Sequence, residues 1–305
     1  MIEDWENMLG IRPERIVTDL HPRYISSALG ERLSKDRGIP LWKVQHHHAH
    51  GLSVMAEHGL SGKAAAFVFD GTGYGTDGTI WGGEILLLEG NQMVRAGHLD
   101  AMPLLGGDIS MKQAWKTGLA SLVYAGLQAE DHRYGLVKAA LEAGVNTIRD
   151  SAMGRLFDSA AALLHLKEEN RFKGECAMAL EQAAVQAKRK GKTALPLHLS
   201  LKEEKGQLIW HREDLIASLV EADGTIEEAA LGFHRAIVDM VVESARLLGV
   251  EQVILTGGCF HNGILWTETK EALTKEHFKV YGNEKVPCGD GGISLGQAFY
   301  GLMQG

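Results

Sequence analysis

Residues 69 to 84, FDGTGYGTDGTIWGGE, form the most informative segment of the sequence, and the apolar runs on either side of it predict the architecture. The run before it, Ala64 to Phe69, is continuously apolar, which is typical of a strand covered on both faces. Thr79 to Leu88 and Met93 to Leu99 predict two more strands, so the three would form an antiparallel meander. A plain hairpin needs only two turn residues. We therefore interpret DGTGYGTDG, residues 70 to 78, as a loop that binds a ligand.

The composition of this loop indicates an anionic ligand. Glycines allow backbone N–H groups to approach and wrap an anion such as phosphate. Asp70 ends the buried strand, where its carboxylate can bind a cation that neutralises phosphate charge. The alternative is an Asp-Gly hairpin turn without a ligand.

A histidine cluster, HHHAH at residues 46 to 50, lies in a segment that is predicted to be helical. Residues four apart share one helix face, so His46 and His50 could present two imidazoles to one metal ion. Surface histidines near a helix start are the alternative interpretation. The glutamate of HExxH is missing, so the motif does not indicate protease chemistry.

Four later motifs are weak when taken singly: LTGGCFHN (255 to 262), CGDGGISLGQA (288 to 298), GRLFD (154 to 158) and FKGE (172 to 175). The first places a helix start after a glycine turn, which suits a nucleotide but is common in α/β proteins. Asp290 in the second is equally suited to an N-cap. Asp158 in the third could accept hydrogen bonds from ribose hydroxyls, or be one acid on an amphipathic helix.

The remaining pattern predicts an α/β protein with two lobes. Further strands are expected at 15–19, 41–44 and 252–256, a hairpin at 196–201 and 207–211, and a long helix at 227–248. Two α/β halves with glycine turns at strand ends favour a cleft between lobes. We expect one domain over residues 1–305, with lobes of about 1–105 (plus the C-terminal helix, 290–305) and 106–289, and Leu104 to Gly107 as the crossover.

Composition excludes several other classes of protein. The formal net charge is −8 and the pI is near 6.0, which argues against stable binding of nucleic acid. No apolar run approaches the roughly 20 residues of a membrane helix, and the N-terminus does not resemble a signal peptide. Cys176, Cys259 and Cys288 form no CxxC pair, which disfavours disulfides and a structural zinc finger. We expect a cytoplasmic protein in a reducing compartment.

Taken together, these motifs resemble the Kae/TsaD/HypF/NodU group of the ASKHA (actin-like) superfamily over nearly the whole chain. VQHHHAH followed by FDGTGYGTDGTIWGGE is especially similar to HypF proteins. The resemblance implies a two-lobed ASKHA fold, related to the sugar kinase, Hsp70 and RNase H-like folds, with a nucleotide cleft between the lobes. One stretch departs from HypF: ISMKQAWKTG, residues 109 to 118, replaces the usual Arg-Glu-Pro-containing segment.

The resemblance also implies a ligand set. One divalent metal, iron or zinc, would be held by His46, His50, Asp70 and Asp290, of which the first three act catalytically through the metal. ATP, AMP or carbamoyl-adenylate, with or without Mg, would bind in the cleft. The implied nucleotide-binding residues are Gly71, Thr72, Gly73, Asp158, Gly174, Gly257, Gly258 and Asn262.

The implied reaction is transfer of a carbamoyl group from carbamoyl-adenylate to the C-terminal cysteine of a HypE-like protein, on the route to the cyanide ligands of [NiFe]-hydrogenase. A YrdC-like domain, in cis in a longer parent or in trans, would make the adenylate, because no such region is recognised here. Cys259 and Cys288 adjoin the site loops, so each is a candidate acyl relay or a buried core residue. The alternatives are NodU-like O-carbamoylation of a small molecule, TsaD-like threonylcarbamoyl transfer, and a non-catalytic nucleotide-binding partner.

Overall fold

The computed structural model describes residues 2–304, so Met1 and Gly305 of the predicted domain lie outside the described residues. The α-helices have the following bounds: α1 Ile2–Leu9, α2 Ile25–Arg37, α3 His46–His58, α4 Ala114–Tyr124, α5 Tyr134–Glu142, α6 Met153–Leu163, α7 Glu175–Arg189, α8 Glu213–Glu221, α9 Ile226–Leu248, α10 Gly263–Lys275 and α11 Ile293–Leu302. The strands are β1 Ile16–Asp19, β2 Leu41–Val44, β3 Lys63–Tyr74, β4 Ile80–Glu89, β5 Gln92–Leu99, β6 Met102–Leu105, β7 Thr147–Asp150, β8 Ser200–Glu204, β9 Gln207–His211, β10 Gln252–Thr256 and β11 Lys279–Gly282. Three short 3-10 helices lie at Gly107–Met111, Gly258–His261 and Asp290–Gly292.

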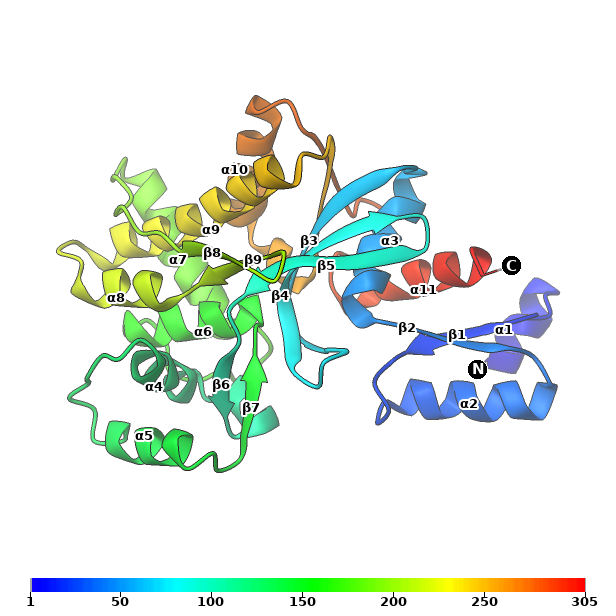
Figure 1. Cartoon of the computed structure of the whole chain (residues 1–305), viewed down its shortest axis with the longest axis horizontal. Helices are drawn as coiled ribbons and strands as arrows, with labels where there is room; N and C mark the ends of the chain where they lie inside the picture. Colours follow the sequence, from blue (N-terminus) through cyan, green and yellow to red (C-terminus); the bar gives the residue numbers. More distant parts are fainter. Residues whose placement is uncertain (1, 305) are drawn as a thin grey trace.

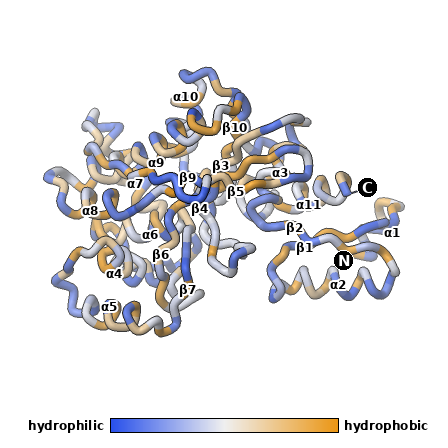
Figure 2. Tube along the Cα trace, in the orientation of Figure 1, coloured by the Kyte–Doolittle hydropathy of each residue, from blue (hydrophilic) through white to orange (hydrophobic). Residues whose placement is uncertain are grey.

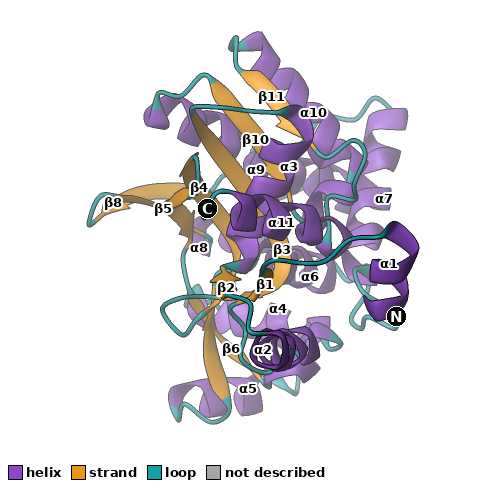
Figure 3. Ribbon diagram, turned by 90° about the vertical axis from the view of Figure 1, so that its right-hand side faces the viewer, coloured by secondary structure: helices purple, strands orange, loops and turns teal. Residues whose placement is uncertain are grey.

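A mixed sheet of nine strands runs through the molecule, with the main order β11-β10-β3-β4-β5-β9-β8 (Figures 1 and 3). β3 pairs antiparallel with β4, and β4 pairs antiparallel with β5, which confirms the predicted meander. β3 is also parallel to β10, and β10 to β11. The carboxyl ends of β3 and β10 therefore meet at one edge of the sheet, where ligands bind in open α/β sheets.

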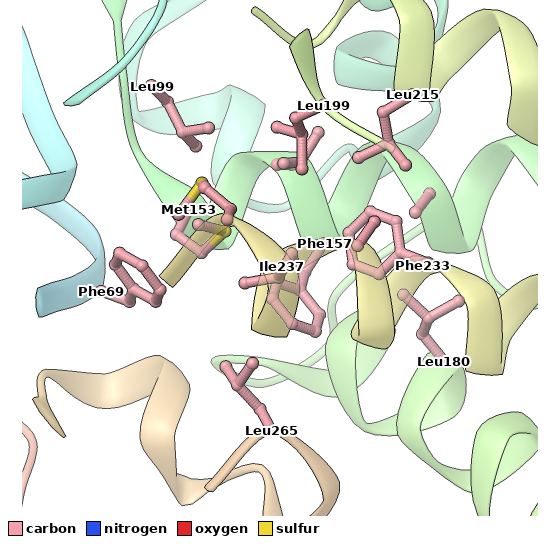
Figure 4. Close-up of a cluster of buried hydrophobic side chains, with 14 of the residues drawn as sticks. Phe69, Leu99, Met153, Phe157, Leu180, Leu199, Leu215, Phe233, Ile237 and Leu265 are labelled. Carbon is pink, nitrogen blue, oxygen red and sulfur yellow. The ribbon is translucent and has the colours of Figure 1, made fainter. Parts of the chain in front are cut away.

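β3 is buried on both faces, and its alternation builds two cores. Ala65, Phe67 and Phe69 face the larger core, which packs against α4, α6, α7 and α9. The rings of Phe157 and Phe233 in that core pack edge to face, with 5.0 Å between their centroids (Figure 4). Ala64, Ala66 and Val68 face the smaller core, formed with α3. The hydrophobic colour of β3 at the centre of the molecule reflects this double burial (Figure 2).

A small N-terminal unit extends from the main body. β1 and β2 form a separate two-stranded parallel sheet, with α2 packed beside it (Figure 1). The C-terminal helix α11 lies between this unit and α3, and contacts both. The start of α11 is thereby placed next to the histidine-bearing helix, although more than 200 residues separate them in the sequence.

Three sequence predictions need correction. Asp70–Tyr74 belongs to β3 and does not form a loop, because pairing with β4 resumes at Gly73 after an irregularity that follows Phe69. Leu104 and Leu105, from the segment predicted as a crossover, belong to strand β6, which pairs with β7. The first hairpin strand begins at Ser200 rather than residue 196.

One sheet contains strands from both predicted lobes, so sheet pairing does not mark the boundary near residue 105, and that division stays a prediction. No helix within residues 2–304 is both long and apolar enough to cross a bilayer.

Candidate functional site

The predicted ligand residues come from three elements that meet at the carboxyl edge of the central sheet. His46 and His50 lie one turn apart at the start of α3, whose N-cap Gln45 accepts a hydrogen bond from His48 N. Asp70 is the last residue of the buried segment of β3, and Asp290 opens the turn that leads into α11. The packing of α11 on α3 brings Asp290 to the two histidines.

One ligand atom from each of these four residues lies within 4.8 Å of every other. The Nε2 atom of His46 is 3.4 Å from Asp70 Oδ2 and 3.6 Å from Asp290 Oδ1. The Nε2 atom of His50 is 3.9 Å from the same two oxygens. A tetrahedral zinc ion with bonds of about 2.0–2.2 Å would separate its ligand atoms by roughly 3.3–3.6 Å. We call these four residues the ligand cluster; its spacing suits one metal ion.

Buried polar atoms without hydrogen-bond partners also fit a metal at the ligand cluster. The Nε2 atoms of His46 and His50 are buried and have no hydrogen-bond partner within residues 2–304. Buried polar atoms without partners are costly, so a ligand is expected there. His46 Nδ1 is 2.8 Å from the carboxylate of Asp19. Because a carboxylate accepts, the neutral His46 ring carries its proton on Nδ1, and a metal would take the place of a second proton at Nε2, as in the carboxylate–histidine pairs of metal sites. Metal binding by these residues stays a prediction.

The electrostatics of the ligand cluster favour positive charge. Burial lowers the pKa of His46, but the carboxylates of Asp19, Asp290 and Asp70 outweigh it and raise that pKa to about 12. The nearby His46 ring, whose Nε2 is 3.6 Å from Asp290 Oδ1, lowers the pKa of Asp290 to about 2. Burial instead lowers the pKa of His50 to about 4. The cluster therefore presents two carboxylates and a neutral imidazole, and it stabilises a cation among them.

A pocket of about 530 Å³ adjoins the ligand cluster, and Asp70 and Asp290 form part of its lining. Five of the predicted nucleotide-binding residues line it as well: Gly71, Asp158, Gly174, Gly258 and Asn262. The volume falls in the range typical of small-molecule sites. Residues that are distant in sequence thus surround one space large enough for a nucleotide, and their roles as nucleotide contacts stay predictions.

Three other predicted nucleotide-binding residues are not among the lining residues. A Cβ atom on Gly73 would collide with the His47 ring, and one on Gly257 with the Phe69 carbonyl. These two glycines therefore have a packing explanation, and Gly257 also has a left-handed φ of 99°. The hydroxyl of Thr72 faces Met111 Sδ at 4.0 Å.

Asp158 and Asn262 already have partners inside the protein. Asp158 Oδ1 accepts a hydrogen bond from Asn170 at 3.0 Å. Asn262 caps α10 by accepting from Leu265 N, and its side-chain nitrogen lies 2.9 Å from His234 Nε2.

Sequence reasoning missed several residues of the site. Asp19 contacts His46. Its role could have been predicted from the sequence, because β1 and β2 are parallel and their carboxyl ends place Asp19 beside Gln45 and His46. Arg155 and Lys173 lie within quoted motifs but were not singled out; both line the pocket, as does His261. Lys173 Nζ is 3.0 Å from Asp290 Oδ2.

Comparison with family models gives two matches that together span most of the chain. Residues 1–57 match the model described as "HypF Kae1-like domain". Residues 66–297 match "Carbamoyltransferase, Kae1-like Domain, second subdomain". The break between the two models falls between α3 and the main part of β3.

Curated relatives agree with these models. A carbamoyltransferase HypF homolog of Cupriavidus necator is 34% identical over 316 residues, which cover 95% of this chain and 78% of the relative. HypF of a Synechocystis strain is 34% identical over 93% of this chain and 40% of its own length. The chain thus spans about two fifths of some relatives and over three quarters of another.

Two solved structures have the same fold. One, described as full-length HypF in the phosphate- and nucleotide-bound form, superposes with a TM-score of 0.89 at 32% identity and covers all of this chain and 41% of that one. HypF of T. kodakarensis superposes with a TM-score of 0.83 at 29% identity, over 99% of this chain and 43% of that one.

Proposed function

Because the chain belongs to the family of Kae1-like domains of HypF carbamoyltransferases, we propose that it transfers the carbamoyl group of carbamoyl-adenylate to the C-terminal cysteine of a HypE-like acceptor protein. The product would serve synthesis of the cyanide ligands of [NiFe]-hydrogenase. One observation supports this above others: the ligand cluster and the pocket share Asp70 and Asp290. A nucleotide in the pocket would therefore lie beside the cation site.

The chemistry is acyl transfer. The thiolate sulfur of the acceptor attacks the carbamoyl carbon and forms a C–S bond. The bond from that carbon to the phosphate oxygen breaks, and AMP leaves with the electron pair. An iron or zinc ion at the ligand cluster would supply Lewis acidity toward the carbamoyl carbonyl. The contribution of the chain itself is positional: Asp19 fixes the His46 ring, and the pocket walls orient the nucleotide.

The nucleophile is expected to come from the partner protein. Burial raises the pKa of the Cys259 thiol well above its ordinary value, and burial also raises that of Cys288. A thiol is nucleophilic as its thiolate. Neither cysteine is thus suited to act as an acyl relay at neutral pH, which favours direct transfer to the acceptor.

Carbamoyl-adenylate is expected to come from a YrdC-like domain, in cis or in trans. Two highly anionic substrates, carbamoyl phosphate and ATP, must be brought together to form it, and their repulsion must be offset by positive charge. Among the described residues that line the pocket, Arg155 and Lys173 are the formally cationic ones, against four carboxylates: Asp70, Asp158, Glu181 and Asp290. This lining suits the adenylate better than the two separate substrates.

A two-part assay tests the proposal. Purified chain loaded with zinc or iron(II) is first given carbamoyl phosphate and ATP, and AMP formation is expected to be negligible. It is then given carbamoyl-adenylate and a protein with a HypE-type C-terminal cysteine, and mass spectrometry should show a gain of one carbamoyl group on that cysteine. The matched control is an acceptor with the cysteine replaced by serine. Transfer that fails with metal and adenylate present would refute the proposed acceptor chemistry.

A further inference from the structure

Arg155 is a buried cation whose side chain lacks adequate partners. Its residue exposure is 8%, and its Nη2 atom lies 2.9 Å from Asp158 Oδ2. Its Nε and Nη1 atoms are buried and have no hydrogen-bond acceptor among residues 2–304. A buried guanidinium with two unmet nitrogens is unfavourable. This side chain can therefore gain from an anionic ligand.

The location of Arg155 suits an anion. It lies in the first turn of α6, whose N-cap Ala152 offers no side-chain acceptor. The first amides of a helix lack partners within the helix and attract negative charge. A Cβ atom on Gly154 would lie 2.8 Å from Gly71 Cα, so the start of α6 packs directly against the chain that follows Asp70. Gly71, Gly154 and Arg155 all line the pocket.

We propose that Arg155, together with the first-turn amides of α6, binds the phosphate group of the nucleotide beside Gly71. This inference rests on the proposed function for the nature of the ligand, and it adds the residue that recognises the phosphate. A guanidinium matches phosphate oxygens in a two-pronged geometry that lysine cannot provide. Lys173, the other cation of the lining, is 76% exposed at its side chain and engaged with Asp290.

A two-pronged contact with phosphate requires the Arg155 side chain to move. Because Nε and Nη1 do not reach solvent, the guanidinium meets a ligand with these atoms only by turning away from Asp158 into the pocket. That movement releases Asp158 Oδ2, while Oδ1 keeps its hydrogen bond from Asn170. The released oxygen can accept from a ribose hydroxyl, so phosphate and ribose recognition would be linked through one ion pair.

Titration calorimetry with AMP and with adenosine, in the presence of zinc, tests the assignment. Arg155→Met should weaken AMP binding by about 10- to 100-fold, because hydrogen bonds to a charged group are lost, and should change adenosine binding little. Arg155→Lys should give an intermediate loss. The matched control is Arg171→Met, since Arg171 is 77% exposed at its side chain and pairs with Glu175 outside the pocket; it should leave both affinities unchanged.

A measurement on the unaltered chain guards against misfolded variants. Inorganic phosphate should compete with AMP and should not compete with adenosine. Equal losses for AMP and adenosine in Arg155→Met, or phosphate that fails to compete with AMP, would overturn the role of Arg155 while the proposed nucleotide binding stands. An unaltered chain that binds neither AMP nor adenosine would overturn both.

Discussion

The ligand cluster and the helical wall of the pocket differ in how far their polar groups are satisfied. The helical wall comprises the lining residues of α6 and α7 with Asn262. At the ligand cluster, both histidine Nε2 atoms are buried without hydrogen-bond partners among the described residues. On the helical wall, Asn262 caps α10 and contacts His234, and Asp158 accepts from Asn170. Arg155 and the Oδ2 atom of Asp158 are exceptions on that wall, since each has buried polar atoms without a hydrogen-bond partner among the described residues.

This difference separates residues held in place by the fold from residues that await a ligand. Asn262 has a structural role whether or not a nucleotide is present, so its loss would damage the protein in both states. Among the described residues, the Nε2 atoms of the ligand-cluster histidines have no comparable structural partner. Replacing these histidines should therefore mainly reduce metal binding.

The largest effect is expected from His50→Ala. Removing one of four ligands opens the coordination sphere, so the metal content should fall from about one ion per chain to near zero. The matched control is His48→Ala on the same helix, because His48 is equally buried but faces Tyr300. That variant should lose stability and keep its metal. Elemental analysis after dialysis measures both, and equal metal content in the two variants would refute the ligand assignment.

His234, the buried partner of Asn262 on the helical wall, should make the stability of the protein depend on pH. Burial lowers the pKa of His234 to about 4, so the unfolded chain takes up this proton first as pH falls. The contribution of neutral His234 to the free energy of unfolding is complete above about pH 6.5. It is lost on acidification, by about 2 kcal/mol at pH 5. Urea unfolding without metal should show that the stability gap between wild type and His234→Gln shrinks by that amount between pH 7.5 and 5. A gap that is equal at both pH values would contradict this.

Asp19→Asn should weaken the ligand cluster without removing a ligand. The substitution replaces the carboxylate that orients His46 through Nδ1, at 2.8 Å, with a neutral amide. Loss of such an outer partner typically costs about 10- to 100-fold in metal affinity. Competition with a chromogenic zinc chelator measures the change. An affinity equal to that of wild type would mean that Asp19 does not position His46.

Gly258→Val should weaken both parts of the site, with the smallest change in affinity. A Cβ atom at Gly258 would lie 2.9 Å from Asp70 Oδ1, so it would displace a metal ligand while filling the pocket. We expect AMP affinity to fall about 10-fold, with a parallel fall in zinc affinity. Gly135→Val is the control, since Gly135 faces open space on α5. A loss of AMP binding without any loss of zinc affinity would separate the two parts of the site.

The sequence predicted what is local and missed what depends on packing. The spacing of His46 and His50 is a property of one helix, and it placed both on one face as expected. Asp290 joins them only because α11 packs on α3, so its place came from family resemblance and not from spacing. Asp70–Tyr74 was predicted as part of a loop, and glycine is depleted in strands, but pairing with β4 that resumes at Gly73 extends β3 through these residues.

Arg155 was missed for a related reason. It lies three residues before Asp158 on one helix, a spacing typical of exposed ion pairs. Only the packing of α6 against Gly71 shows that the pair is buried beside a pocket.

The most direct test of a shared metal and nucleotide site is a crystal structure of the chain with zinc and AMP, with anomalous data collected at the zinc edge. We predict one strong peak bonded to His46 Nε2, His50 Nε2, Asp70 and Asp290. AMP should occupy the pocket lined by Gly71, Asp158 and Asn262. Zinc bound elsewhere, or AMP outside that pocket, would contradict the account.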